Sequence, residues 1–513
     1  IRGAGGVVSG LLSAIGQRPV TWIALAMTDA DRILARVRGK AAIQGSDDLE
    51  NIALRLVDVP QAAYSRYYDG ISNRILWFAQ HYLLQPTAPR QFSERTHKDW
   101  EQGYSAVNEA VAEAVLAEME AQGTATTVLF QDYHLYLAPE RVRAARPDAQ
   151  LAHFIHIPWP ESRYWELVPD EMVRAIFRGL ASNDLIGFQT HRDVRNFIEG
   201  APRFLEGATP VLDERGDMVA LDWQGRRILV QAYPIAVTPT EVLASAEQDD
   251  AAAGADYLCK ELDDDMKLIV RVDRVEPTKN IVRGFQAYER LLRTHADLRG
   301  KVTFLALLVP SRQGMREYQT YERQIRRQVE RINARFGRPG WQPIVAIFGN
   351  HRARALACMR RFDVLLVNPL IDGMNLVVKE GALVNERNGV VLLSRTAGAF
   401  EQLGEHALGI PPLDVWATAE ALHQALTMGD EERHIRASAM KRILHDEDAH
   451  QWLMSQLDDL GRHLRVMQLA HRPAVAQLRH RIIPADGADD GLRSIAEVRA
   501  SLHDAGDEVA VSM

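Results

Sequence analysis

The stretch that decides the fold is Ile371-Asp372-Gly373-Met374-Asn375-Leu376-Val377-Val378-Lys379-Glu380. It follows the apolar run Val364-Leu365-Leu366-Val367. This run lacks the alternation of apolar and polar residues, which predicts a buried strand of a parallel sheet. After the Asp-Gly turn the apolar residues recur at helical spacing. A strand, a tight glycine turn and a helix N-terminus form a ready anion site, because free N–H groups and the helix dipole point outward there.

Two polar residues in this turn extend the anion site. Asp372 and Asn375 add groups that can hydrogen-bond hydroxyls beside a bound anion. That combination suits a sugar joined to a diphosphate, which is a nucleotide sugar. An isolated Asp-Gly-x-Asn is more often an ordinary strand–helix junction with an Asx turn, so the interpretation needs a second motif.

The second motif lies earlier in the chain, after the apolar run Leu268-Ile269-Val270. It reads Arg271-Val272-Asp273-Arg274-Val275-Glu276-Pro277-Thr278-Lys279-Asn280. Arg274 and Lys279 flank a proline-stiffened loop and could converge on one point. A guanidinium binds phosphate oxygens in pairs and an ammonium adds a point charge. Alone, the two cations would be read as a solvated surface pair; with the first motif, phosphate binding is favoured.

Composition limits the class of protein. The 513 residues exceed one ordinary core and suggest two or three domains. Hydrophobic and charged fractions of 47% and 25% are typical of a globular protein, and the net charge of −8 argues against a nucleic-acid partner. Two cysteines, Cys259 and Cys358, favour a reducing cytoplasm. No apolar run approaches the roughly 18 residues of a membrane span, and none resembles a signal peptide.

The chain divides into two halves of the same kind. Residues 1–236 and 237–450 each alternate apolar strands with helix-length patterns, which predicts an α/β fold with two Rossmann-like domains. Ligands of such sheets bind at the carboxyl ends of the strands, so we expect a cleft between the domains. Residues 471–513 are expected to form a mobile tail without a catalytic role.

Several short motifs occur in the order found in one known family. They are Gly3-Ala4-Gly5-Gly6-Val7-Val8, Tyr67-Tyr68, Leu76-Trp77, Gln131-Asp132-Tyr133-His134, His156-Ile157-Pro158-Trp159-Pro160, Gly187-Phe188-Gln189-Thr190, Pro310-Ser311-Arg312 and the run from Asp372 to Glu380. Over about residues 3–465 the chain resembles the trehalose-6-phosphate synthases, family 20 of the retaining glycosyltransferases. The resemblance implies the GT-B architecture: an acceptor domain, a nucleotide-sugar domain and a return helix at 451–470 that crosses back to the first domain.

The glycine loop raises a question about the first domain. Such loops normally follow a strand, so the first strand is expected to be missing from this chain. In the family an arginine after that strand contacts the acceptor phosphate; Arg2 lies too close to the glycines to be that residue. Gly6 would let the backbone approach the donor phosphate because it has no side chain in the way.

The resemblance implies a role for each donor-side residue. Arg274 and Lys279 would stabilise the leaving diphosphate, and Asp372 would bind a glucose hydroxyl. Glu380 would accept hydrogen bonds from ribose hydroxyls. Backbone N–H groups would hold the diphosphate and sugar at Gly373, Met374, Asn375, Leu376 and Val377. His156 is by default a core histidine, but the resemblance favours a contact with the transferred glucose. It is not expected to act as a general base, because the leaving phosphate is thought to deprotonate the acceptor hydroxyl.

Four residues are expected on the acceptor side. Arg312 is the best cation for a sugar phosphate, and Asp132 matches the carboxylate that binds sugar hydroxyls. Tyr68 and Trp77 match contacts to the acceptor phosphate and sugar. Their spacing of nine is close to two and a half turns of an α-helix, which would not place them on one face, so core packing is the alternative for these two.

No metal or other cofactor is expected. The resemblance implies metal-independent transfer, and the paired aspartates, such as Asp47-Asp48 and Asp249-Asp250, lie in polar loops rather than strand-end turns. The expected partners are a nucleotide sugar and a sugar phosphate, with no nucleic acid or membrane, and a homo-oligomer is left open. The nucleotide base would lie near Ile347-Phe348-Gly349, where backbone contacts leave no residue code.

The expected reaction is transfer of glucose to glucose 6-phosphate, giving trehalose 6-phosphate. Two departures keep alternatives open. Many family members have a second tryptophan near Leu25, in a loop close to the substrates. Another phosphorylated acceptor, such as glycerol 3-phosphate, is the enzymatic alternative, because acceptor specificity depends on Tyr68, Trp77, Asp132 and the missing N-terminal arginine. The Arg274–Asn280 loop is also similar to that of pseudo-glycosyltransferases, although the Asp-Gly-Met-Asn-Leu-Val motif in which those diverge is intact. A non-catalytic sugar-phosphate sensor would be indicated by loss of Arg274, Lys279 or Glu380, and all three are present.

Overall fold

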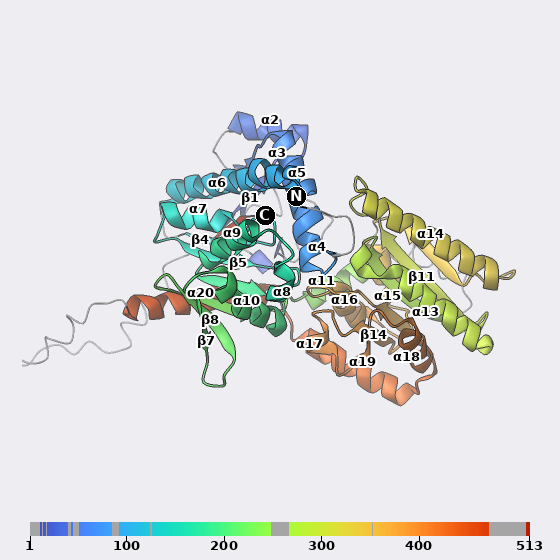
Figure 1. The fold of residues 1–513 in the computed structure, drawn as a ribbon. Helices are drawn as coiled ribbons and strands as arrows, with labels where there is room; N and C mark the ends of the chain where they lie inside the picture. The colour runs from blue at the N-terminus through green and yellow to red at the C-terminus, as the bar shows by residue number, and fades with distance from the viewer. Residues whose placement is uncertain are drawn as a thin grey trace, which may run out of the picture.

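The computed structural model describes residues 11–12, 14–16, 18–38, 43–44, 51–84, 92–123, 126–247, 266–350, 352–470 and 509–512. These residues form two lobes, each built on a β-sheet with helices packed around it (Figure 1). The predicted α/β class with two Rossmann-like domains is confirmed.

The sheet of the first domain has the order β2-β3-β1-β16-β4-β5-β6-β9-β8-β7. Its strands are β1 (Val20–Leu25), β2 (Ile43–Gln44), β3 (Ile52–Val57), β4 (Thr127–Gln131), β5 (Gln150–Phe154), β6 (Leu185–Phe188), β7 (Thr209–Leu212), β8 (Met218–Trp223), β9 (Arg226–Ala232) and β16 (Val509–Ser512). The strands from β3 to β9 in this order are parallel, and β2, β8 and β7 pair antiparallel at the two edges.

The helices of this domain cover the sheet and line its carboxyl end. They are α2 (Asp29–Arg38), α3 (Gln61–Ser65), the π-helix η2 (Arg66–Leu76), α4 (Trp77–Gln80), α5 (Glu94–Asp99), the π-helix η3 (Trp100–Ser105), α6 (Ala106–Gln122), α7 (Ala138–Ala145), α8 (Ser162–Trp165), α9 (Asp170–Ala181) and α10 (His191–Phe204). Local sequence fixes several ends. The Thr190 hydroxyl caps α10 by accepting from the Asp193 N–H, and α6 ends at Gly123, whose φ of +65° suits glycine.

The sheet of the second domain is parallel throughout, in the order β12-β11-β10-β13-β14-β15. Its strands are β10 (Lys267–Arg274), β11 (Val302–Val309), β12 (Ile344–Phe348), β13 (Val364–Val367), β14 (Val390–Ser394) and β15 (Leu408–Ile410). Every residue of β13 is buried, as its apolar sequence predicts. Around the sheet lie α11 (Pro239–Ala246), α13 (Ile281–Thr294), α14 (Arg316–Phe336), α15 (Arg352–Met359), α16 (Leu376–Val384), α17 (Phe400–Leu403), α18 (Val415–Thr427), α19 (Asp430–His445) and the short helices η4 (Pro277–Lys279) and η5 (Ala296–Leu298).

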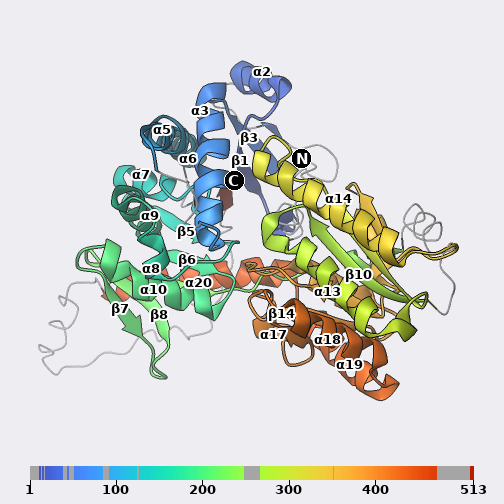
Figure 2. The ribbon, with the colours of Figure 1, turned by 45° about the vertical axis from the view of Figure 1, so that its right-hand side comes forward.

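The last long helix, α20 (Ala449–Ala470), returns from the second domain to the first (Figure 2). The Trp452 indole N–H donates to the Tyr233 carbonyl at 3.0 Å, and its ring meets the Phe154 ring at a centroid distance of 4.9 Å. Further along, His463 Nε2 lies 2.9 Å from the Arg227 carbonyl oxygen. These contacts join the domains along the linker, which leaves the carboxyl ends of both sheets to face each other.

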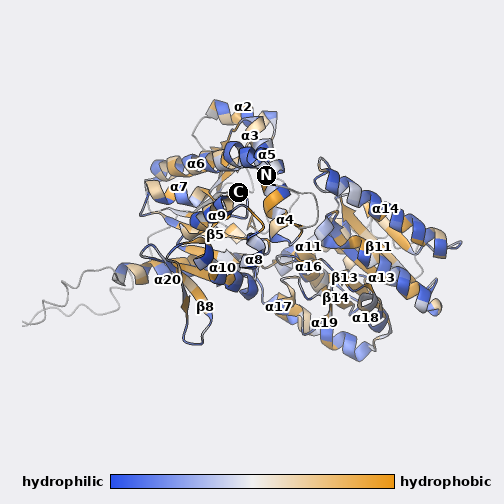
Figure 3. Ribbon diagram, viewed as in Figure 1, coloured by the Kyte–Doolittle hydropathy of each residue, from blue (hydrophilic) through white to orange (hydrophobic). Residues whose placement is uncertain are grey.

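Apolar residues concentrate on the strands, whereas the outer helices carry polar residues between apolar ones (Figure 3). One buried cluster continues from the first domain, through the linker, into the second; it includes Trp22, Phe154, Tyr233, Val270 and Trp452. Burial of this area from water is the main source of stability of the junction. The two domains are therefore packed together on the linker side.

The strand β16 differs from the prediction. Residues 471–513 were expected to form a mobile tail, but 509–512 pair in parallel with both β1 and β4, with Val509 opposite Val20 and Thr127. The prediction is wrong for these four residues, and residues 471–508 lie outside the described ranges.

Candidate active site

The turn before α16 is organised by Asn375. Its φ of +81° is left-handed, a conformation that asparagine tolerates better than most residues. Its side-chain oxygen accepts from the Val378 N–H, and its amide donates to Asp372 Oδ2 at 3.0 Å. Asn375 therefore shapes the turn and orients Asp372. The remaining N–H groups at the start of α16 have no partner within the helix, as an anion site requires.

Lys279 and Asp372 form an ion pair across the two motifs, with Nζ 2.5 Å from Oδ2. Burial alone would raise the pKa of Asp372, but Lys279 lowers it overall; likewise burial is outweighed for Lys279, whose pKa is raised by Asp372 and Asp273. Both groups are thus charged. The structure brings the two predicted motifs together, and it shows that Lys279 is already paired, whereas the Arg274 side chain is 51% exposed.

Gly373 lies where the two domains touch. A Cβ at this position would lie 1.9 Å from the His156 carbonyl oxygen, so only glycine allows this approach. The contact seats the donor turn of the second domain directly on the loop after β5 of the first.

His156 is buried and neutral. Burial lowers the pKa of its imidazole to about 3. Its Nε2 lies 2.8 Å from Gln131 Oε1, and its ring packs near Phe154 and Trp452. A neutral imidazole can hydrogen-bond a sugar hydroxyl but carries no charge at physiological pH, which fits the predicted contact role rather than acid catalysis.

Asp132 lies at the end of β4 with a φ of +64°, an uncommon conformation that is often found at active sites. Its Oδ1 accepts from the His156 N–H at 3.2 Å. Burial raises its pKa to about 7, although this hydrogen bond and Arg312 act in the opposite direction. Asp132 therefore titrates near neutrality.

The raised pKa of Asp132 predicts a pH-dependent stability. A carboxyl with a higher pKa in the folded state contributes stability below its unfolded pKa and loses that contribution as pH rises through about 7. An asparagine at position 132 has nearly the same shape as aspartate but has no carboxyl group to titrate. We therefore expect the urea midpoint of Asp132→Asn to rise relative to the wild type from acid to mildly alkaline pH. A difference that stays constant with pH would show that Asp132 has an ordinary pKa.

Arg312 reaches across the cleft from the loop after β11. Its Nη2 donates to the Tyr133 hydroxyl at 3.3 Å, its guanidinium lies 4.8 Å from the centre of the Trp77 ring, and Nη1 donates to the Tyr318 hydroxyl. On the first domain the Tyr68 ring stacks on His134 at 5.8 Å. The predicted acceptor residues are thereby connected into one group through Tyr133 and its neighbour His134.

Tyr68 and Trp77 do not lie on an ordinary α-helix. Residues Arg66–Leu76 form a π-helix, and Trp77 begins α4. A π-helix bonds i to i+5 and has more residues per turn than an α-helix, so the α-helical spacing argument against a shared face does not apply. Trp77 is buried and Tyr68 is half-buried, and both lie beside the Arg312 group.

Of the other predicted donor-side residues, Glu380 offers a side chain to a ligand, whereas Met374, Leu376 and Val377 offer backbone groups. Glu380 is paired with Arg352 at 2.7 Å, so a ribose would share this carboxylate with Arg352. Met374 is buried, and Leu376 and Val377 pack against the core, which leaves only their backbone groups for a ligand. Gly6 lies outside the described residues.

Four residues of this region were not predicted as site residues: His81, Tyr133, Glu276 and Tyr318. Burial lowers the pKa of His81 to about 4, and its ring lies 4.2 Å from the Trp77 ring. Tyr133 and Glu276 belong to two of the sequence motifs, but their residue types alone do not indicate a role in the site. For His81 and Tyr318 the sequence carried no signal, because only the folding of distant segments places them here.

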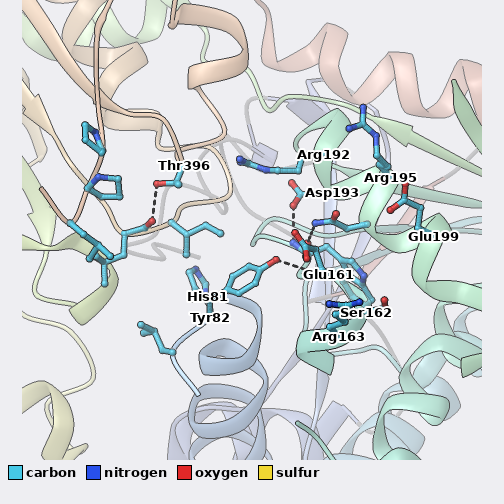
Figure 4. A pocket seen from close by; sticks show the side chains of 18 residues that line it. His81, Tyr82, Glu161, Ser162, Arg163, Arg192, Asp193, Arg195, Glu199 and Thr396 are labelled. Atoms are coloured by element: carbon cyan, nitrogen blue, oxygen red, sulfur yellow. Dashed lines mark hydrogen bonds between the residues drawn. The ribbon is translucent and has the colours of Figure 1, made fainter. Parts of the chain in front are cut away.

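A cavity of about 980 Å³ opens between the domains beside this site (Figure 4). Its first-domain wall includes Arg192 and Glu161, its second-domain wall includes Ile371 and Thr396, and His81 lies between them. Ile371 immediately precedes Asp372, so the cavity adjoins the predicted sugar site.

Neither a metal site nor a membrane-spanning helix is present within the described ranges. No group of three or more His, Cys, Asp or Glu side chains is arranged to hold a metal ion in that part of the chain. No described helix is long and apolar enough to cross a bilayer.

The sequence is similar to those of known glycosyltransferases. The model of glycosyltransferase family 20 matches residues 2–462. The bifunctional trehalose-6-phosphate synthase/phosphatase of Thermoproteus tenax is 33% identical over 440 residues, which is 85% of this chain; the chain spans only 56% of that relative. The validamine 7-phosphate valienyltransferase of Streptomyces hygroscopicus subsp. jinggangensis is 28% identical over 90% of this chain and 88% of its own.

A solved structure extends the likeness to the whole fold. The α,α-trehalose-phosphate synthase (UDP-forming) of Burkholderia xenovorans, in complex with glucose-6-phosphate, matches with a TM-score of 0.77 and 31% identity over 90% of this chain and 97% of its own. With the family model covering most of the sequence, this chain belongs to glycosyltransferase family 20.

Proposed function

We propose that the chain transfers glucose from a nucleoside-diphosphate glucose to glucose 6-phosphate and forms trehalose 6-phosphate. The observation that carries the proposal is the presence of two groups of cations in one cleft. Arg274 and Lys279 lie in the donor motif, and Arg312 lies in the loop after β11, where it contacts Tyr133 of the first domain. The glucose-6-phosphate complex and the UDP-forming activity named for the Burkholderia relative support it.

On the donor side, the α16 N-terminus and Arg274 hold the diphosphate. Departure of the diphosphate places negative charge on its oxygens as the bond to C1 of glucose breaks. A preorganised cation and helix N–H groups stabilise that charge more in the transition state than in the ground state. Asp372, held by Lys279 and Asn375, accepts hydrogen bonds from the glucose.

On the acceptor side, Arg312 binds the phosphate and Asp132 accepts from sugar hydroxyls as a carboxylate. Arg312 is fixed by the Tyr133 and Tyr318 hydroxyls, so it is preorganised for a doubly charged group. Neutral His156 contacts the transferred sugar. The attacking hydroxyl gives its proton to the leaving phosphate on the same face, which retains the configuration at C1.

The observations that favour a second candidate are the side chain at Leu25 and the size of the cavity. Leu25 is partly buried against the core instead of presenting a tryptophan ring, and the cavity beside Asp372 leaves room for another acceptor. A family-20 glucosyltransferase acting on a different phosphorylated acceptor is therefore the alternative. The valienyltransferase relative shows a further branch within the same range of identity.

The kinetics of two variants should distinguish residues that bind the donor from residues that bind the acceptor. Arg312→Ala removes a charge-assisted contact to a phosphate dianion, worth roughly 1.5–3 kcal/mol, so the KM for glucose 6-phosphate should rise about 10- to 150-fold. Glu380→Gln should instead raise the KM for the nucleotide sugar, because an amide accepts ribose hydrogen bonds less strongly than a carboxylate. Initial rates with each substrate varied in turn measure both.

The controls for this experiment come from the substrates. Unphosphorylated glucose, if accepted, should be nearly indifferent to Arg312→Ala. Weakening of the nucleotide sugar with unchanged use of glucose 6-phosphate would place Arg312 on the donor side and remove the main support for the proposed acceptor. Offering UDP-, GDP- and ADP-glucose to the wild type decides the base.

The proposed transfer needs no metal ion and takes place in the cytoplasm. We expect transfer without an added metal, so activity should persist in EDTA after dialysis; an absolute requirement for a divalent cation would contradict the role given to Arg274 and Lys279. We place the activity in the cytoplasm, which the low cysteine content favours.

A further inference from the structure

Glu276 lies between the donor-side cation Arg274 and the acceptor-side cation Arg312. It follows β10 in the same loop as Arg274, and its side chain is 1% exposed. Its Oε1 is 3.2 Å from Arg274 Nη1, 3.9 Å from Arg312 Nη1 and 3.1 Å from the Ser311 hydroxyl, which donates to it. One carboxylate oxygen thus lies close to groups from two neighbouring strand-end loops of the second domain, the loop after β10 and the loop after β11.

The carboxylate is ionised despite its burial. Burial alone would raise the pKa of Glu276, but Arg274, Arg312 and Lys279 together lower it below its usual value. A buried carboxylate without partners is strongly unfavourable. The buried Glu276 carboxylate therefore depends on these cations for its stability, and it in turn holds Arg274 and Arg312 in place.

Arg274 needs such a partner more than Arg312 does. Its long side chain is half exposed, and within the described residues its ion pair is with Glu276. Arg312 is already held by hydroxyls and by the Trp77 ring. Without Glu276 the Arg274 guanidinium would sample several rotamers, and its distance from Arg312 would not be defined.

We propose that Glu276 is a positioning residue that sets the separation between the donor-phosphate cation Arg274 and the acceptor-phosphate cation Arg312. The inference rests on the proposed function. It assigns no contact between Glu276 and either substrate. Because both substrates are anchored through their phosphates, the separation of the two guanidinium groups fixes how C1 of the donor meets the acceptor hydroxyl.

A simple counter-ion role makes the opposite prediction. If Glu276 only neutralised the site, its removal would leave the cleft more positive. Anionic substrates would then bind as tightly or more tightly, and kcat would be unchanged. A positioning role requires weaker binding and slower transfer although the net charge has become more favourable for anions.

The test compares three purified full-length variants. Glu276→Gln keeps the shape and an oxygen for the Ser311 hydroxyl but removes the charge. Glu276→Asp keeps the charge with a shorter reach. The matched control is Glu289→Gln, because Glu289 also pairs with two arginines, Arg331 and Arg335, but between α13 and α14. Initial rates give kcat and both KM values, and calorimetric titration with UDP gives donor-side affinity without transfer.

For Glu276→Gln we expect UDP affinity and kcat each to fall at least about 10-fold, with a higher KM for glucose 6-phosphate. Glu276→Asp should recover most of the UDP affinity, and Glu289→Gln should match the wild type. UDP bound by Glu276→Gln as tightly as by the wild type, at unchanged kcat, would overturn the proposal. Because UDP titration needs no acceptor, a wild type that binds UDP but makes no product from glucose 6-phosphate would count against the proposed function alone.

Discussion

Arg274→Ala should lower turnover at least roughly 100-fold, equivalent to about 2.7 kcal/mol of transition-state stabilisation. The reason is the loss of a preorganised cation at the oxygens of the leaving diphosphate. The side chain is 51% exposed, so we expect a nearly unchanged melting temperature. Steady-state turnover and thermal unfolding of the same preparation measure both effects.

Arg227→Ala is the matched control for this variant. Arg227 is also half exposed and paired with a carboxylate, Asp222, but it lies on β9 near the edge of the first sheet. It should keep wild-type turnover. Near-normal turnover in Arg274→Ala would remove its role at the leaving group. Lys279→Ala is a less clean test, because it would leave the buried carboxylate of Asp372 without its cation and should lower stability as well as turnover.

Lys379→Met should destabilise the protein by about 3–5 kcal/mol. Lys379 is buried in α16, where its Nζ lies 2.8 and 2.9 Å from the two oxygens of Glu447 and 2.9 Å from the Ile235 carbonyl oxygen. Burial lowers the pKa of Lys379, although Glu447 acts in the opposite direction. Removing the lysine leaves the Glu447 carboxylate buried with only the Gln402 amide as a hydrogen-bond donor among the described residues.

The double variant Lys379→Met/Glu447→Met is the control. Replacing both partners by apolar side chains of similar volume removes the unpaired charge, and such replacements are often neutral. Its midpoint in urea should return most of the way to that of the wild type. Equal midpoints for Lys379→Met and the wild type would show that this pair, which joins the donor helix to the linker, contributes nothing to stability.

The fold was predictable because its signals are local. Each buried strand of the second sheet is a short apolar run, and a turn or loop with polar residues follows it, so parallel βαβ units could be read directly. The same locality revealed Asp372, Lys279 and Arg274, which lie in compact motifs. The structure brings these motifs together as expected.

The features that escaped prediction depend on distant segments. The π-helix under Tyr68 and Trp77 changes which residues share a face, and sequence periodicity does not distinguish it from an α-helix. The close approach of Gly373 to the His156 carbonyl exists only between two folded domains. The strand Val509–Ser512 pairs with segments hundreds of residues away, and a segment of four residues is too short to indicate this from sequence.

Product identity tests the central claim most directly. The wild type is incubated with UDP-glucose carrying a ¹³C label at C1 and unlabelled glucose 6-phosphate, and the product is analysed by mass and by NMR of the labelled carbon. We predict a phosphorylated disaccharide in which the labelled C1 is in the α configuration and bonded through oxygen to C1 of the second glucose. Labelled glucose released to water alone, or no product from glucose 6-phosphate where another phosphorylated acceptor is glucosylated, would contradict the account.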